Sequence, residues 1–175
     1  MKRYSKVKSV IIIVMGLPGS GKSYFAKALA KEIGADYLGS DRTRKEIGLM
    51  GKYQLNNKMS VYEEMLSRAK EIHKSGNSLV LDGTFYKQKI RDSFISFAQS
   101  LSWKLYIIHV IADEELILKR LSKPRQESEA DIIVYQKIKS EFEPIQEAHL
   151  QIQSTDGSLK ERLEKAVKYI YSNHE

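Results

Sequence analysis

The sequence contains no cysteine among its 175 residues. Disulfide bonds, thiolate nucleophiles and cysteine-based metal sites are therefore excluded, and a cytoplasmic location is the natural expectation. The four histidines lack the spacing of metal ligands, so we expect no zinc site. The most apolar run, Val10 to Met15, is six residues long, whereas a membrane-spanning helix needs roughly 20. We expect no membrane partner.

Acidic residues are fewer than basic ones, 22 against 29, which gives a formal net charge of +7. The excess lies in residues 1–8 and in the windows 41–58, 82–91 and 119–126. This distribution favours a phosphate-rich site over a surface that coats nucleic acid. We expect residues 1–9 to form a basic tail and residues 10–175 to form one domain.

Short apolar runs alternate with longer segments of helical period, a pattern that predicts an α/β fold with a parallel sheet. We expect strands at 10–15, 36–38, 78–82, 104–110 and about 149–153. We expect helices at 22–33, 41–47, 58–75, 87–101, 113–121, 130–142 and 158–171. The first strand does not alternate polar with apolar residues, which indicates burial on both faces. The irregular stretches 48–57 and 122–129 are either substrate loops or lids, or plain surface connections.

The strongest motif directly follows the first strand and directly precedes a helix. It reads Gly16, Leu17, Pro18, Gly19, Ser20, Gly21, Lys22, Ser23 and matches G-x-x-x-x-G-K-[ST], the Walker A phosphate-binding loop, or P-loop. Glycines let the backbone N–H groups turn inward around a phosphate chain. We predict that these eight residues, with Tyr24 directly after them, bind a nucleotide.

Two side chains of this motif carry specific chemistry. Lys22 is expected to reach the β- and γ-phosphates as a point charge, and the Ser23 hydroxyl is expected to bind Mg²⁺. The helix that begins at the loop adds unpaired N–H groups and the positive end of its dipole. A guanine-reading N-K-x-D pattern is absent because Asn57 and Lys58 are followed by Met59 and Ser60, which favours ATP.

A second group of candidates follows the second strand, at the sheet edge that also carries the phosphate loop. Asp41 can orient an acceptor hydroxyl and take its proton, and Arg44, three residues later on the same helical face, can hold an anionic group. The alternative is a helix cap formed by Ser40 or Asp41.

Two further positions are candidates for charge neutralisation. Asp82 ends the third strand, where an acid holds Mg²⁺ in related motifs, although it can also be a turn residue before Gly83. Arg120 and Arg125 belong to a run of four cations that either forms a solvated face or supplies arginines to a closing lid around 122–130.

These residues resemble the P-loop kinase group of zeta-toxin and polynucleotide-kinase-like ATPases, a set of AAA-type ATP-binding proteins. The resemblance spans residues 10–156 and is carried by GLPGSGKS at 16–23, SDRTRKE at 40–46, LVLDGTF at 79–85, the stretch 125–131 and FEPI at 142–145. It implies a three-layer fold with a five-stranded parallel sheet of order 2-3-1-4-5 and helices on both faces.

The resemblance also implies roles for individual residues. Asp41 corresponds to an acid that activates the acceptor hydroxyl, and Arg44 to its substrate-anchoring partner. Arg120 and Arg125 correspond to lid arginines. The loop 155–157 lies where related folds approach adenine.

The sequence therefore predicts a kinase that uses ATP and Mg²⁺ to phosphorylate a hydroxyl group, with a small-molecule acceptor favoured. Two alternatives stay open: an ATP-binding or ATP-hydrolysing switch that phosphorylates nothing, and a protein that binds or phosphorylates a polynucleotide 5′ end. The basic cluster of Lys87, Lys89 and Arg91 has no assigned role.

Overall fold

The computed structural model describes residues 10–123, 131–155 and 157–172. The basic tail and most of the expected lid, including Arg125, lie outside the described residues. Five parallel strands form one sheet of order β2-β3-β1-β4-β5, which confirms the implied topology. The strands are β1 (Val10–Met15), β2 (Asp36–Gly39), β3 (Leu79–Gly83), β4 (Lys104–Ile111) and β5 (His149–Gln153).

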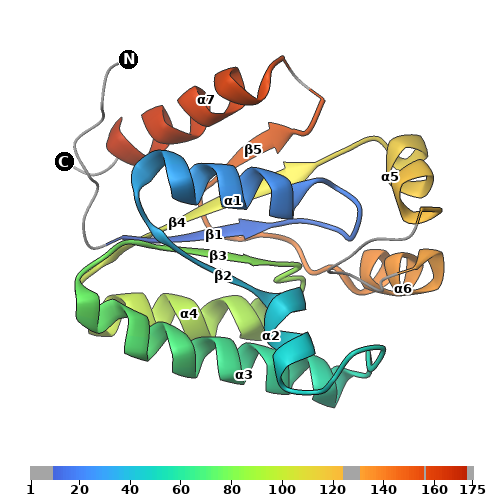
Figure 1. Ribbon diagram of the computed structural model, residues 1–175, viewed down its shortest axis with the longest axis horizontal. Helices are drawn as coiled ribbons and strands as arrows, with labels where there is room; N and C mark the ends of the chain where they lie inside the picture. The colour runs from blue at the N-terminus through green and yellow to red at the C-terminus, as the bar shows by residue number, and fades with distance from the viewer. Residues whose placement is uncertain (1–9, 124–130, 156, 173–175) are drawn as a thin grey trace.

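Helices cover both faces of the sheet (Figure 1). They are α1 (Lys22–Ile33), α2 (Ser40–Glu46), α3 (Leu55–Ile72), α4 (Gln88–Ser100), α5 (Glu114–Leu121), α6 (Ile132–Glu141) and α7 (Leu159–Ser172), with a 3₁₀ turn η1 (His73–Ser75) after α3. Helices α1 and α7 lie on one face, and α3 and α4 lie on the other. Helices α5 and α6 lie at the end of the sheet where the strands finish (Figure 1).

Strand β1 is the centre of the core. Alternate residues of β1 feed two apolar clusters: Ile11, Ile13 and Met15 pack with α3 and α4, whereas Val10, Ile12 and Val14 pack with α1 and α7. All six side chains are fully buried, as the absence of alternation predicts.

The element boundaries differ from the predicted ones by up to three residues, and two of the differences matter for the site. Helix α3 begins at Leu55, so Lys58 lies inside its first turn. Helix α2 begins at Ser40 with Gly39 as its N-cap, and no side chain caps it. A capping role for Ser40 or Asp41 is therefore wrong.

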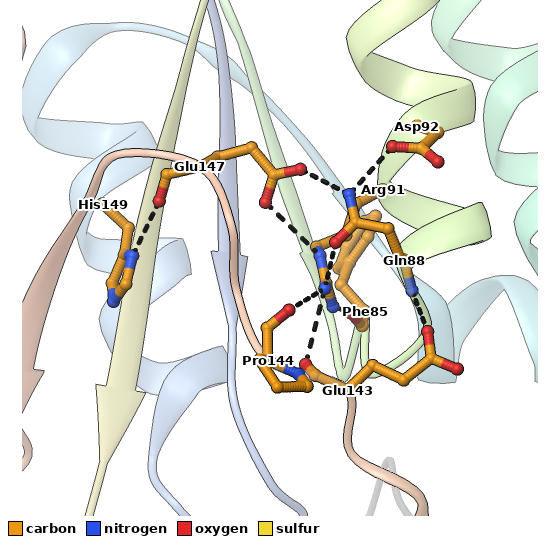
Figure 2. A network of polar contacts seen from close by, with 8 residues as sticks. All are labelled: Phe85, Gln88, Arg91, Asp92, Glu143, Pro144, Glu147 and His149. Atoms are coloured by element: carbon orange, nitrogen blue, oxygen red, sulfur yellow. Dashed lines mark hydrogen bonds and ion pairs between the residues drawn. The ribbon is translucent and has the colours of Figure 1, made fainter.

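The unassigned Arg91 is a fully buried residue of α4 (Figure 2). Its guanidinium donates hydrogen bonds to the Phe85 carbonyl at 2.8 Å and to the Pro144 carbonyl at 2.6 Å, and it lies 3.6 Å from Glu147. These contacts hold the connection between α6 and β5 against the loop that follows β3. Strand β3 itself ends beside the start of the phosphate loop, because Gly83 pairs with Met15.

Across the described residues, no helix is both long enough and apolar enough to cross a bilayer.

Candidate nucleotide and acceptor sites

The phosphate loop turns from β1 into α1 through backbone conformations that require glycine. Gly16 has φ +156°, and a Cβ on it would lie 2.3 Å from the Val110 carbonyl oxygen of β4. Gly21, with φ +93°, is the left-handed N-cap of α1. A side chain at either position would strain the loop or fill the space beside it. The loop is therefore built as an open cradle at a helix N-terminus, where anions bind.

Asp82 lies beside this cradle because β3 pairs with β1. Parallel register places Asp82 opposite Val14 on one side and opposite Gly39 on the other. Its carboxylate is buried and accepts a 2.7 Å hydrogen bond from the Tyr37 hydroxyl. Burial raises the pKa of Asp82, while Lys22 and the hydroxyls of Tyr37 and Ser23 act in the opposite direction. The carboxylate thus lies within the electrostatic reach of both Lys22 and Ser23.

A pocket on the α2 side of the loop collects the predicted acceptor residues. It is lined by Pro18, Lys22, Ser40, Asp41, Arg44, Tyr53, Lys58, Tyr62, Thr84 and Ile138. Lys22 comes from the phosphate loop, and Asp41 and Arg44 come from successive positions of one face of α2. Strand ends that are far apart in sequence meet here because all strands are parallel.

Arg44 is held rigidly at this pocket, with 5% of its surface exposed. Its Nη1 donates to the Lys52 carbonyl at 2.9 Å, and its guanidinium stacks over the Tyr53 ring with 4.7 Å to the ring centroid. Tyr53 belongs to the irregular stretch 48–57, so that stretch contributes at least one side chain to the pocket.

Lys58 lines the same pocket and was missed by the sequence reasoning. It occupies the first position of the buried stripe of α3, which continues through Val61, Tyr62, Met65 and Ala69. A lysine at a core-facing helical position was the available signal. It was overlooked because the predicted helix began at Lys58, where a charged residue is unremarkable.

A second pocket lies on the opposite side of the loop, next to α7. It is lined by Gly21, Tyr24, Phe25, Val110, Arg120, Ile152, Ser154 and Arg162. Arg120 donates to the Gly19 carbonyl at 3.0 Å and to the Ser154 hydroxyl at 3.3 Å, so it braces the phosphate loop against the end of β5. Tyr24 is 66% exposed and lies at the rim. This pocket borders the loop expected to approach adenine, of which Asp156 is outside the described residues.

Buried side-chain polar atoms without a hydrogen bond occur in the phosphate loop, on the adjoining strand β3 and in the pocket beside α2. Six buried side-chain polar atoms lack a hydrogen bond in the part of the chain that the structure describes, and three of them are Ser20 Oγ, Asp82 Oδ1 and Arg44 Nε. Buried polar groups are normally paired, so orphans at a glycine cradle fit a phosphate ligand and a cation. Ser23 and Asp82 would hold Mg²⁺, which takes few protein ligands when phosphates supply the others. The described residues contain no cluster of three or more His, Cys, Asp or Glu side chains suited to a metal.

Residues 11–145 match the model of a family described as AAA domain. The chain belongs to this family. Its curated relatives include an uncharacterised protein of Mycobacterium bovis, 32% identical over 93 residues, which cover 46% of this chain and 19% of that protein. The chain therefore spans about a fifth of the length of the curated relatives it first matches.

Solved structures of kinases share the fold of this AAA-domain protein. A sugar kinase from Janibacter superposes with a TM-score of 0.71 and 17% identity, covering 94% of this chain and 95% of the other. The APS kinase of Mycobacterium tuberculosis, solved with AMPPNP and APS, has a TM-score of 0.70 and 14% identity, covering 93% and 97%. The chain thus shares the P-loop kinase fold of these solved structures.

Proposed function

We propose that this protein transfers the γ-phosphoryl group of ATP to a hydroxyl group of a small molecule. The observation that carries the proposal is the pocket that brings Lys22 of the phosphate loop together with Asp41 and Arg44 of α2. A nucleotide switch needs the loop, but it has no need of an acid and an arginine facing an adjoining pocket. Kinases among the structural neighbours support the same class of reaction.

Each residue has a role in this reaction. The loop amides and Lys22 bind the β- and γ-phosphates, and Ser23 and Asp82 hold Mg²⁺, which neutralises phosphate charge when bound. Asp41 orients the acceptor hydroxyl and takes its proton. The acceptor oxygen then bonds to the γ-phosphorus as the bond to the bridging oxygen of ADP breaks, which leaves ADP and a phosphate monoester.

The pocket next to α7 is proposed to hold the nucleoside beside Tyr24. Arg120 would stabilise the phosphates both directly and through its bond to the Gly19 carbonyl. Arg125 is proposed as a second arginine of the lid.

The variant Asp41→Asn tests the proposal after a screen for acceptor-dependent ADP release with sugars, nucleosides, aminoglycosides and 5′-hydroxyl oligonucleotides. We expect turnover to fall by about 100-fold or more, the usual contribution of a general base, while AMPPNP binding stays unchanged. Asp92→Asn, an exposed site on α4, is the matched control.

Acceptor-independent ATP hydrolysis that is equal in wild type and Asp41→Asn would favour the switch instead. Phosphorylation confined to the 5′-hydroxyl oligonucleotides would identify a polynucleotide kinase and contradict the small-molecule acceptor.

A further inference from the structure

Two buried cations line the pocket beside α2, which we call the acceptor pocket. Arg44 and Lys58 approach the pocket from α2 and α3, and they are 5% and 3% exposed. Burying a charge is costly unless an opposite charge or a full set of hydrogen bonds compensates it. Two buried cations beside each other therefore call for an anionic partner.

Asp41 lines the same pocket and Glu141 of α6 raises the pKa of Lys58, but neither forms an ion pair with Arg44 or Lys58 within the described ranges. Arg44 donates to one backbone carbonyl, that of Lys52, and its buried Nε lacks a hydrogen bond. The Lys58 ammonium lies over the Tyr86 ring, 4.8 Å from the centroid, and no ion pair or hydrogen bond from it is seen among the described residues. The nitrogen donors of Arg44 and Lys58 therefore line the pocket and are available to a ligand.

We infer that the acceptor is a small hydroxyl compound that also carries a carboxylate or a phosphate group, which Arg44 and Lys58 bind. The inference rests on the proposed kinase function. A guanidinium fork and an ammonium point charge together suit either anion. With the anionic group fixed between α2 and α3, the hydroxyl group of the compound faces Asp41 and Lys22 in the same pocket.

The charges around Lys58 agree with this assignment. Burial lowers the pKa of Lys58 to about 8; Glu141 of α6 raises it, whereas Lys137 of α6, Arg44 and Lys87 lower it further. A bound anion would supply the missing negative charge and raise the pKa again.

Matched acceptor pairs test the inference: gluconate against sorbitol for a carboxylate, and glycerol 3-phosphate or adenosine 3′-monophosphate against glycerol or adenosine for a phosphate. We expect the anionic member of at least one pair to have a KM at least tenfold below that of its neutral partner. In Lys58→Met, the KM for that anionic compound should rise about 10- to 100-fold, as for a lost hydrogen bond to a charged group, with kcat changed far less.

Lys87→Met is the matched control, because Lys87 contacts the same Tyr86 ring but pairs with Glu143 and does not line the pocket. Its KM should equal that of the wild type. Equal use of neutral and anionic compounds, or an unchanged KM in Lys58→Met, would overturn the inference and leave the kinase function standing.

Calorimetric binding to the AMPPNP-saturated protein separates the two proposals when no turnover is found. If an anionic compound binds and Lys58→Met weakens its binding, the anion site is supported, whereas the absence of turnover contradicts the kinase function. Failure of every anionic member to bind at about 1 mM, the upper end of ordinary KM values, overturns the anion site.

Discussion

At the scale of single residues, Lys58 lies in an environment that is unfavourable for its positive charge, and we propose that it binds the anionic group of the acceptor. Its ammonium is buried among other cations, so the folded state binds the Lys58 proton less tightly than the unfolded state does. A polar group that is costly to the fold and faces a pocket is a common mark of a binding site. Stability and acceptor binding should therefore respond to its substitution in opposite directions.

We predict that Lys58→Met raises the midpoint of thermal unfolding by about 2–5 °C at pH 7. The folded pKa is about 8 and the unfolded value is 10.5, so the cost of the buried charge is fully present below pH 8. In the wild type this cost is lost as the pH rises toward 10.5, and the free energy of unfolding rises with it. The advantage of the variant should shrink over the same interval.

Thermal unfolding across this pH range, with Lys87→Met measured in parallel, checks the prediction. A less stable Lys58→Met protein at pH 7 would show that Lys58 has a structural role and would contradict this account.

Single residues also show what the sequence could and could not reveal. Lys22 and Asp41 follow strand ends and Asp82 lies near the end of β3. Parallel strands deliver their ends to one edge of the sheet, so the proximity of these residues was predictable. Lys58 and Arg91 were not assigned, because their burial depends on contacts between segments that are distant in sequence. The sequence around Arg91 does not indicate which backbone carbonyl groups its guanidinium contacts.

At the scale of elements, helix α4 fixes the connection from α6 to β5 through Arg91 (Figure 2). Helix α5 braces the phosphate loop in a similar way through Arg120. The succession of strands and helices along the chain followed from apolar periodicity, whereas the order of the strands within the sheet followed from the family resemblance. The alternative that Ser40 or Asp41 caps α2 was wrong because Gly39 occupies the N-cap position and no side chain caps the helix, which leaves no sequence signal of the usual kind.

The variant Arg91→Leu tests the role of α4. It leaves the Phe85 and Pro144 carbonyls without their donor, and we expect a loss of about 2–4 kcal/mol in the free energy of unfolding. Lys89→Met, an exposed neighbour on the same helix, should change it by less than about 0.5 kcal/mol. Urea titration measures both, and equal stability of the two variants would refute the bracing role.

At the scale of the whole molecule, the parallel sheet places the two pockets that we propose for the nucleotide and the acceptor on opposite sides of one loop. Positive charge collects in the windows 41–58, 82–91 and 119–126, each of which contributes at least one residue to these pockets. The folded state should therefore be stabilised by nucleotide.

We predict that Mg²⁺ and ATP at about 100 times their dissociation constant add about 2.7 kcal/mol to the free energy of unfolding. Lys22→Ala should abolish most of this gain because it removes the charge that reaches the β- and γ-phosphates. Thermal unfolding with and without ligand measures it, and an equal gain in the variant would place the nucleotide elsewhere.

The most direct test of the central claim follows the radiolabelled γ-phosphate of ATP in wild type and Asp41→Asn, with the acceptors that support ADP release. The account predicts that the wild type moves the label to the hydroxyl of a small molecule and that the variant, although it binds AMPPNP equally well, does not. Label that appears only as inorganic phosphate, at the same rate in both proteins, would contradict it.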